Sequence, residues 1–429
     1  MALSDRRFWG WFFVFLLFVI GCLLFWLWRQ RQASGGPERA LRLLEKRYWP
    51  DFRDDLSLDS LKKSLDRNLA FLAARKAGEK VTYGPVTYTY GELFAAQQRL
   101  RHFLDRADIG EVGSFLRENF VVYEAGADFT QQKKILVTGY YVPLLRGSQQ
   151  PDERYRYPLY HPPADLVRVS LAEYHLSDIL RRRSFLWRWL LRLDGEPDFP
   201  SLVGRLTPAK RVIPYYTRRE IDEQHVLTGK KLEIFWLDND CDRFFLHIQG
   251  SGRVVLPDGQ MVTVGYAATN GRPYRSIGGW LIRHGYLEKD EVTLPVIRKF
   301  LQQHPEMRST VFNRNPSYVF FRRLAGQDVL GCWAIPLTAG RSIATDRRLF
   351  PGGALAYLVS EKPVFDPGNK VIKWKPFGRL VFNQDTGGAI RGNRRVDLFC
   401  GVGEEAEQMA GVMKQPGRLF FLAPKKTKE

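Results

Sequence analysis

The sequence is short of cysteine. Its 429 residues contain four cysteines, at positions 22, 241, 332 and 400. Cys22 lies inside a long apolar run near the N-terminus, which leaves three, and an odd number cannot form a closed disulfide framework. One bridge within the remaining three, or three buried thiols, are both compatible with the sequence. A framework of several disulfides is excluded.

Motifs of metal-dependent and nucleophilic hydrolases are also missing. The seven histidines, at positions 102, 161, 175, 225, 247, 284 and 304, show no His-Glu-x-x-His or other ligand spacing. No glycine-rich phosphate loop opens a helix after a strand, and no Gly-x-Ser-x-Gly nucleophile elbow is present. We therefore expect neither a metal nor a cofactor. We expect His247 to lie in a strand as a core or groove residue.

The aspartic-protease triplet Asp-Thr-Gly occurs only once, at residues 385–387. Aspartic proteases need two such loops, because two facing carboxylates share one proton. The preceding Asn383 and Gln384 are polar where the strand of a protease is apolar. The sequence therefore disfavours this class.

A long hydrophobic segment is present at the N-terminus. Residues 8–28 form an uncharged, mostly apolar run of twenty-one residues, long enough to cross a bilayer as a helix. It exceeds a signal-peptide core and lacks a small-residue cleavage site, which favours an uncleaved signal anchor. The alternative is a lipoprotein signal ending at Cys22, because Val19–Cys22 loosely fits a lipidation box. Both place the rest of the chain outside the cytoplasm on a membrane, and flanking arginines leave the orientation open.

The net charge of +19 indicates an anionic partner, which can be nucleic acid, anionic lipid or an acidic polymer. Export argues against nucleic acid and leaves a lipid or cell-wall partner. The basic and aromatic segment at 179–193 suits a helix on an anionic membrane surface. It also suits contacts to the carboxylates of an acidic polymer, or a solvated helix that packs its Leu/Trp side on its own domain.

Apolar periodicity predicts helices in the first part of the chain and strands after it. Leucines between Leu56 and Leu72 recur at three- and four-residue spacing, with Ser57 and Asp59 available as caps. Further helices are predicted over 90–104, 112–119, 276–284 and 294–304. Strands are predicted over 135–141, 232–237, 244–249 and 262–266, with short strands from 330 to 422. The pattern indicates an α+β fold, mainly β, with one or two small barrels.

Two aspartates near the C-terminus form the strongest candidate site. Asp385 and Asp397 lie twelve positions apart. The glycines between them allow a positive φ, which lets the backbone lie against a ligand; they are Gly387, Gly388 and Gly392. Apolar residues around Asp397 predict a short strand that holds it rigidly; they are Val396, Leu398 and Phe399. A rigid acid above a glycine-lined groove suits acid–base chemistry on a polymer.

Further segments form an ordered set of motifs. They are Thr138–Pro143, His247–Gly252, Tyr266–Gly271, Tyr274–Gly278, Asn315–Phe321, Ile335–Thr338 and Arg341–Arg347. Together with the C-terminal segment, and in this order, they resemble the motifs of the membrane-bound lytic transglycosylase A family, which cleaves peptidoglycan. The resemblance runs from about residue 137 to about residue 422.

The resemblance implies a double-psi β-barrel domain with helices, built from residues 37–143 and 324–429. A smaller, substrate-binding β-barrel domain would be inserted at 144–323, with the glycan strand between the two. Residues 1–36 would be the membrane anchor or signal segment with its linker. Family members are typically lipid-anchored, which favours Cys22, whereas Leu23–Trp28 continue the apolar run where a polar tether should begin. Either anchor places the protein in the periplasm.

The implied reaction breaks the bond between N-acetylmuramic acid and N-acetylglucosamine. The C6 hydroxyl of the muramic acid attacks its own C1 and gives a 1,6-anhydro product, so neither water nor a covalent intermediate is needed. One carboxyl group, implied to be Asp397, first donates a proton and then accepts one. Its apolar neighbours would supply the desolvation that an acid needs at neutral pH. Asp385 would orient the sugar or stabilise charge at C1, or would instead cap a turn.

The resemblance also implies which residues bind the sugar. Thr138, Tyr140, Gln249 and Ser251 would hydrogen-bond hydroxyl and N-acetyl groups. The remaining candidates are Tyr141, Gly250, Tyr274, Arg275, Ser276, Asp346, Gly387 and Gly388. Two of them, Tyr141 and Arg275, can equally serve packing or pairing alone. Two other functions stay open, a membrane-tethered peptidoglycan-binding protein without turnover and a hydrolytic glycosidase of the double-psi barrel type.

Overall fold

The computed structural model describes residues 40–126, 134–169, 202–290, 292–326, 328–387 and 390–426. The apolar run at 8–28, the basic segment at 179–193 and Gly388 lie outside the described residues. Within the described ranges, no helix is both long and apolar enough to span a bilayer.

The chain divides into two compact units. The barrel unit comprises Met1–Thr138, Gly331–Phe399 and Met413–Glu429. The insert unit comprises Gly139–Leu330 and Cys400–Val412. Each unit is therefore built from segments that are distant in the sequence.

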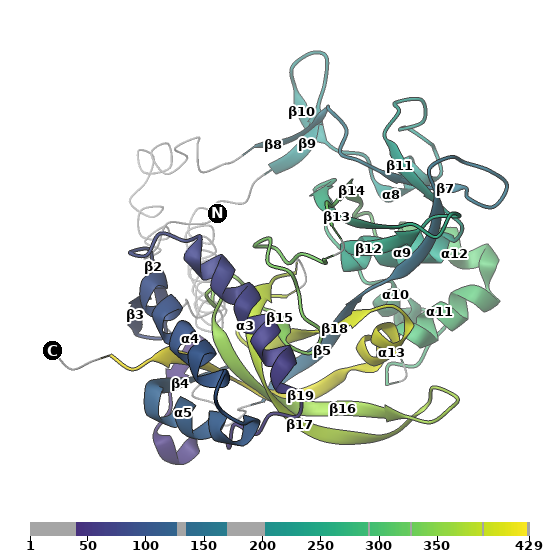
Figure 1. The fold of residues 1–429 in the computed structure, drawn as a ribbon. Coiled ribbons are helices and arrows are strands. Elements are labelled where there is room, and N and C mark those ends of the chain that lie inside the picture. Colours follow the sequence, from purple (N-terminus) through teal and green to yellow (C-terminus); the bar gives the residue numbers. More distant parts are fainter. Residues whose placement is uncertain are drawn as a thin grey trace, which may run out of the picture. The chain divides into compact units, whose positions relative to one another are not determined.

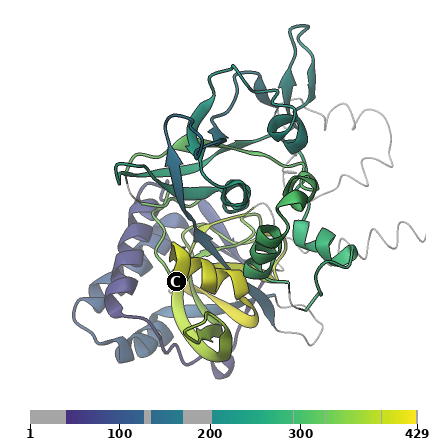
Figure 2. The same ribbon diagram turned by 90° about the vertical axis from the view of Figure 1, so that its right-hand side faces the viewer.

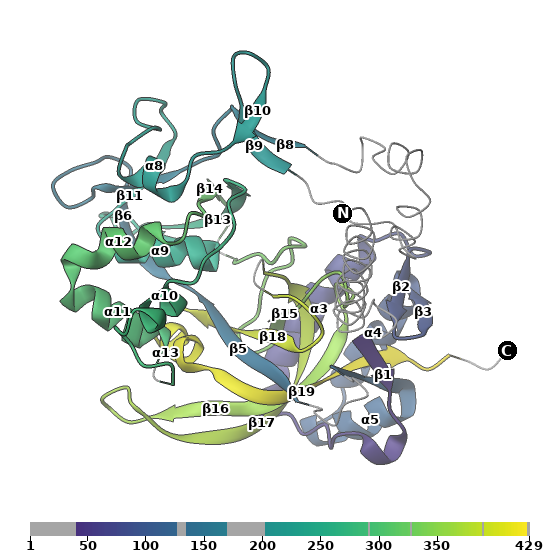
Figure 3. The same cartoon turned by 180° about the vertical axis from the view of Figure 1, so that it is seen from behind.

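The barrel unit is organised around one sheet with the strand order β1-β4-β19-β16-β17-β15-β18-β5. A further pairing of β5 with β19 closes six of these strands into a barrel, and Figure 3 shows β5 between β18 and β19. The strands are β1 Leu41–Leu43, β4 Phe120–Ala125, β5 Ile135–Val142, β15 Ser342–Ala344, β16 Leu355–Phe365, β17 Val371–Asp385, β18 Arg395–Val402 and β19 Lys414–Pro424. The predicted fold class, α+β with a closed barrel, is confirmed.

Helices cover part of this sheet (Figure 1). They are α3 Leu58–Ala73, α4 Tyr90–Leu104 and α5 Val112–Asn119, with short 3-10 turns at Lys46–Tyr48 and Ile109–Glu111 and a hairpin of β2 Lys80–Tyr83 and β3 Val86–Thr89. Ser57 accepts a hydrogen bond from the Ser60 amide and caps α3, as its position predicted. Leu61 and Leu65 of α3 pack with Leu380 and Phe420 in one core, which confirms the predicted leucine face.

The insert unit contains a six-stranded sheet of order β14-β13-β12-β6-β11-β7 and a three-stranded sheet β10-β9-β8. The strands are β6 Leu144–Ser148, β7 Tyr157–Tyr160, β8 Leu166–Val169, β9 Leu202–Leu206, β10 Val212–Pro214, β11 Glu233–Leu237, β12 Ser251–Val255, β13 Met261–Thr269 and β14 Val319–Arg323. The helices are α8 Arg218–Asp222, α9 Asp240–Gln249, α10 Ile277–Arg283, α11 Leu294–Gln303, α12 Arg308–Asn313 and α13 Glu404–Val412, with a 3-10 turn at Pro305–Met307. Figure 2 shows α13 as the yellow helix.

One predicted strand is wrong. Residues 244–249 form the second half of helix α9 and not a strand. The Asn239 side chain accepts hydrogen bonds from the amides of Cys241 and Asp242 and starts the helix. Gly250, with a φ of 79°, ends it in the left-handed conformation. A capped start and a glycine stop therefore outweigh the β-like composition of this segment.

The prediction for the C-terminal region is also partly wrong. Short strands were expected there, but β16 and β19 have 11 residues each and β17 has 15. The helix α13 was missed because it holds only two buried residues, Ala406 and Ala410, and so shows little apolar periodicity.

The cysteines Cys241, Cys332 and Cys400 are free thiols; Cys241 is buried and Cys332 is exposed.

Candidate active site

Asp397 lies in the middle of a barrel strand. Strand β18 pairs antiparallel with β15, and Asp397 stands directly opposite Ala344. Successive side chains of a strand point to opposite faces, so Val396 and Leu398, both buried, point away from the face of Asp397. These two neighbours therefore anchor the strand rather than surround the carboxylate. Phe399 is the apolar neighbour that shares its face.

Two side chains hold the Asp397 carboxylate. The Thr138 hydroxyl on β5 donates to Oδ1 at 2.5 Å. The Arg395 guanidinium donates to Oδ1 through Nε at 3.0 Å and to Oδ2 through Nη2 at 3.2 Å. This two-pronged pairing fixes the plane of the carboxylate as well as its position. Asp397 keeps 9% of its surface exposed, so a substrate atom can still reach it.

Asp385 lies at the same level of the sheet as Asp397. It ends β17 and is the parallel partner of Ala344, the residue that Asp397 faces from the other side. Because neighbouring strands lie about 4.8 Å apart, the Cα atoms of the two aspartates are roughly 10 Å apart across β15. Ala344 carries only a methyl group between them. The register of three strands thus brings the two predicted carboxylates to one place.

Backbone amides also hold Asp385. Its Oδ1 accepts hydrogen bonds from the amides of Thr386 at 2.8 Å and Cys332 at 2.9 Å. The Thr386 hydroxyl donates to the carbonyl of Thr345, the residue after β15, at 2.7 Å, which ties the start of the glycine segment to the end of that strand. A turn-stabilising role of Asp385 is therefore present alongside any chemical role.

Asp346 binds the end of the glycine segment through the Gly392 amide. Its carboxylate pairs with the Arg348 guanidinium at 2.6 Å and accepts from the Gly392 amide at 2.8 Å. Burial alone would raise the pKa of Asp346, but the hydrogen bonds from Arg348 and the Gly392 amide outweigh it and keep the pKa below its usual value. Gly392 has the predicted positive φ, 83°, whereas Gly387 does not lie in that region.

A buried polar network supports the strands that carry the aspartates. The Ser342 hydroxyl donates to the Gln384 side chain, whose amide donates to Asn68 on α3. Asn68 in turn donates to Gln97 on α4, and both contact the Gly353 carbonyl. All four side chains are almost fully buried. The network links two helices to β15 and β17, and sequence reasoning missed it.

Sequence reasoning also missed the role of Arg341. This fully buried guanidinium pairs with Asp54 at 2.5 Å and donates to the carbonyls of Ser57 and Leu380. It therefore joins the start of α3 to β17. Its position in the motif Arg341–Arg347 could have drawn attention to it. An arginine in such a motif is, however, equally compatible with a residue that binds a ligand.

In the insert unit, Gln249 contacts the predicted site residue Tyr141. The Gln249 Oε1 accepts from the Tyr141 amide at 3.4 Å, at the point where Gly250 ends α9 and Ser251 opens β12. The Tyr141 side chain is only 1% exposed, and burial raises its pKa. Packing is thus an established role of Tyr141, while the neighbouring Tyr140 is half-buried.

The segment Tyr274–Ser276 is exposed and precedes α10. Ser276 accepts from the Gly279 amide and caps that helix, and the Arg275 amide donates to the Asn315 side chain. Asn270 makes a similar bridge, because its Oδ1 accepts from the Tyr318 amide. Asn270 and Asn315, the asparagines of two motifs, are therefore structural bridges.

His247 is a core residue, as expected, although in a helix. Its Nδ1 accepts from the Val319 amide at 3.4 Å and lies 3.3 Å from Arg218. Burial and the nearby guanidinium groups lower the pKa of His247 well below its usual value, so it stays neutral. Among the described residues, no group of three or more His, Cys, Asp or Glu is placed to hold a metal ion.

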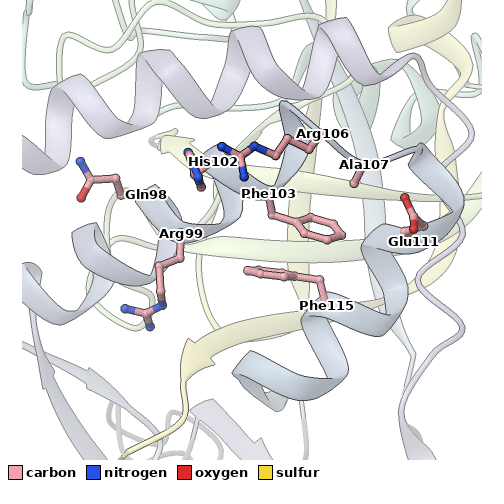
Figure 4. A pocket seen from close by; sticks show the side chains of 8 residues that line it. All are labelled: Gln98, Arg99, His102, Phe103, Arg106, Ala107, Glu111 and Phe115. Carbon is pink, nitrogen blue, oxygen red and sulfur yellow. The ribbon is translucent and has the colours of Figure 1, made fainter.

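A surface hollow of about 660 Å³ lies elsewhere on the barrel unit, along α4 and α5 (Figure 4). The rings of Phe103 and Phe115 stack in it at 4.4 Å, with Arg106 and His102 close by. None of its lining residues belongs to the predicted site.

The matched family models agree with this arrangement. Residues 136–322 match the MltA-specific insert domain, and residues 341–423 match the 3D domain. The fold and site thus define a protein of the class that combines these two domains. The chain is 30% identical to membrane-bound lytic murein transglycosylase A of Vibrio cholerae over 346 residues, which are 76% of this chain and 87% of the relative. The chain belongs to the membrane-bound lytic murein transglycosylase A family.

Three further comparisons concern sequence coverage and structure. Identity to the Escherichia coli enzyme of the same name is 36% over 231 residues, which span 53% of this chain but only 60% of that relative. The crystal structure of a membrane-bound lytic murein transglycosylase from Agrobacterium tumefaciens superposes with a TM-score of 0.69 at 28% identity, covering 90% of this chain and 98% of that chain. E. coli MltA with bound chitohexaose has a TM-score of 0.66 at 22% identity, covering 92% and 98%, and shares the fold.

Proposed function

We propose that the protein is a peptidoglycan lytic transglycosylase. It cleaves the β-1,4 bond between N-acetylmuramic acid and N-acetylglucosamine and leaves a 1,6-anhydro-muramic acid end. The observation that carries this proposal is the Asp397 carboxylate, fixed by Thr138 and Arg395 at the same level of the barrel as Asp385. Family membership and the oligosaccharide bound to E. coli MltA support a glycan strand as the ligand.

The proposed reaction uses Asp397 twice. Protonated Asp397 donates its proton to the glycosidic oxygen as the bond to C1 breaks and the N-acetylglucosamine leaves with its hydroxyl restored. The resulting carboxylate is stabilised by the Arg395 guanidinium and the Thr138 hydroxyl. It then accepts the proton of the C6 hydroxyl while that oxygen forms a bond to C1. Atoms balance without water, because nucleophile and electrophile belong to one sugar.

Asp385 has an electrostatic role in this proposal. The transition state carries positive charge at C1 and the ring oxygen. A carboxylate roughly 10 Å from Asp397 in Cα position can lie on the other side of a sugar ring placed over Ala344. Backbone amides from Thr386 and Cys332 keep that carboxylate oriented. Thr138, Tyr140, Gln249, Ser251 and Tyr274–Ser276 remain the proposed sugar contacts.

Membrane attachment belongs to the same proposal. The apolar run at 8–28 would anchor the protein by a signal anchor or through lipid on Cys22, with the rest in the periplasm. The family's membrane-bound relatives support this placement. A mass measurement of the mature N-terminus separates the two anchors, because only a lipoprotein begins at residue 22.

The experiment that tests the activity is product analysis on purified sacculi by mass spectrometry. Anhydro-muropeptides are expected from the full-length protein. Asp397→Ala should release none while it still sediments with sacculi, and the matched control Asp290→Ala, at an exposed aspartate, should behave as the parent. Products with reducing-end muramic acid would instead identify a hydrolase, and binding without release by the parent would identify a scaffold.

A further inference from the structure

The β16–β17 hairpin extends beyond the point where a third strand pairs with it. Strand β16 pairs with β19 only from Leu355 to Val359. Its pairing with β17 continues much further, to Phe365 opposite Val371. Among the described residues, the strand pairing of residues 360–376, here named the hairpin arm, is therefore only within the arm itself (Figure 1). A two-stranded arm without a third strand gains little from the barrel core.

The two faces of the arm differ in chemistry. Directly opposite residues share a face, so Lys362 with Lys375, and Val364 with Lys373, lie on one side. Pro363 with Trp374, and Phe365 with Val371, lie on the other. Ile372 stands at the irregularity in the pairing and is 60% exposed. One face of the arm thus carries three lysines with Val364, and the other is aromatic and apolar except for Glu361 opposite Pro376. On that second face Pro363 is buried and Phe365 and Trp374 are half-buried, whereas Ile372 near the end of the arm is exposed.

Three of the four lysines on the arm form no ion pair among the described residues, and the arm also carries two carboxylates, Glu361 and Asp366. Lys362 pairs with Asp55 at 2.7 Å. Lys370, Lys373 and Lys375 are exposed and form no ion pair within the part of the chain that the structure describes. Placing Lys375 opposite Lys362 costs stability in an isolated hairpin, since like charges repel across a sheet. An anionic partner would relieve this repulsion.

We propose that the hairpin arm docks on an anionic phospholipid surface. Tryptophan and lysine together are typical of the membrane interface, because the indole ring favours the headgroup region and lysine reaches the phosphates. The arm would meet the membrane end-on, so that residues of both faces reach it: the half-buried Trp374 and Phe365 and the exposed Ile372 would enter the headgroup layer. Lys370, Lys373 and Lys375 would contact phosphate groups, each strengthening the contact roughly five-fold.

The length of the N-terminal linker argues for a membrane rather than a distant partner. The apolar run ends at Trp28, and the first described residue is Ala40. Eleven residues reach about 40 Å at most. A linker of that length gives the arm an effective concentration near the membrane on the order of millimolar, so even a weak contact would be populated. This inference rests on the proposed membrane attachment and is independent of catalysis.

Lysine acetylation of the full-length protein tests the proposal without any substitution. The protein is reconstituted in vesicles of phosphatidylcholine, with or without phosphatidylglycerol, and modification rates are read by mass spectrometry. Lys370, Lys373 and Lys375 should react several-fold more slowly when phosphatidylglycerol is present, and high salt should remove the difference. Lys76 and Lys80, exposed on the same unit, should react equally in both. Equal rates at all five lysines would overturn the proposal.

Charge-reversal variants provide a second test of the proposal. Lys373→Glu/Lys375→Glu should abolish the protection of Lys370, whereas the matched control Lys76→Glu/Lys80→Glu should retain it. Cleavage of sacculi in detergent should be unchanged in both variants, which separates this inference from the proposed activity. Protection that appears only when sacculi are added would identify the glycan, not lipid, as the partner and would contradict the proposal.

Discussion

At the scale of single residues, Asp397 depends on two partners that come from different parts of the sequence. Thr138 is 259 positions away along the chain, and Arg395 is two positions away. Arg395 supplies charge, and Thr138 supplies a directed donor. Arg395 lies two positions from Asp397 on β18 and so shares its face, while Thr138 reaches the carboxylate from β5, so both the strand of the acid and a second strand set its position.

Thr138→Val should weaken catalysis without unfolding the protein. The valine has the same shape as threonine but cannot donate to Asp397, and hydrogen bonds to charged groups are worth about 1.5–3 kcal/mol. Turnover of sacculi should therefore fall roughly 10- to 150-fold. The control is Thr87→Val on the exposed face of β3, which should leave turnover unchanged. Full activity of Thr138→Val would remove this residue from the mechanism.

Asp346→Asn should change the pH dependence of stability. The pKa of Asp346 is held below its usual 3.8 in the folded state. Its ionised form therefore adds stability above about pH 5, and this contribution disappears as the pH falls through the folded-state pKa. The variant should lose roughly 1–3 kcal/mol at pH 7 and show a flatter decline toward pH 3. Urea denaturation across this range measures both, and parallel curves would contradict the account.

At the scale of elements, the helix α13 lies directly against the backbone of β5. A Cβ added to Gly139 would come within 2.6 Å of the Ala410 Cα and 2.9 Å of the Cys400 Sγ. The glycine of the motif Thr138–Pro143 therefore permits close packing and not a turn. A methyl group added at Gly139 could therefore be accommodated only if the backbone of α13 or β5 moved.

Gly139→Ala should accordingly destabilise the protein by about 1–3 kcal/mol, the range for overpacking a tight contact. The control is Gly110→Ala, where a Cβ meets nothing within 4 Å. Thermal unfolding measures both variants side by side. Equal melting temperatures of the two variants would show that α13 shifts to accommodate the added methyl group without loss of stability.

Arg341 joins two elements through a buried ion pair. Arg341→Met would leave the Asp54 carboxylate, which is 1% exposed in its side chain, without its counter-charge. Breaking a buried pair in this way costs about 3–5 kcal/mol. Chemical denaturation should show that loss, whereas Arg347→Met, an exposed arginine of the same motif, should unfold like the parent. A small effect at Arg341 would mean that the carboxylate reaches water.

The elements differ in how far the sequence could predict them. Helix α3 was predictable, because its leucines recur with the helical period and Ser57 caps it. Helix α9 was not, because Asn239 and Gly250 decide its ends while the residues between them resemble a strand. The network of Asn68, Gln97 and Gln384 has no periodic signature, since buried amides find partners only through tertiary structure.

At the scale of the whole molecule, the sequence order of the motifs predicted the family, and the comparisons confirm it. The sequence singles out the two aspartates as a candidate site because both lie in one glycine-rich segment. Their alignment across Ala344 was not, because it depends on a parallel and an antiparallel register that meet on β15. The roles of both aspartates remain predictions until they are measured.

The central claim is that the Asp397 carboxyl group donates a proton to the glycosidic oxygen and then accepts one from the C6 hydroxyl, while that hydroxyl oxygen bonds to C1 of the same sugar. Digestion of sacculi in oxygen-18 water tests it most directly, because the attacking oxygen comes from the sugar and not from solvent. Mass spectrometry of the released muropeptides should show anhydro ends that carry no heavy oxygen, and Asp397→Ala should release none. Heavy oxygen at the new muramic acid ends would show that water is the nucleophile and would contradict the account.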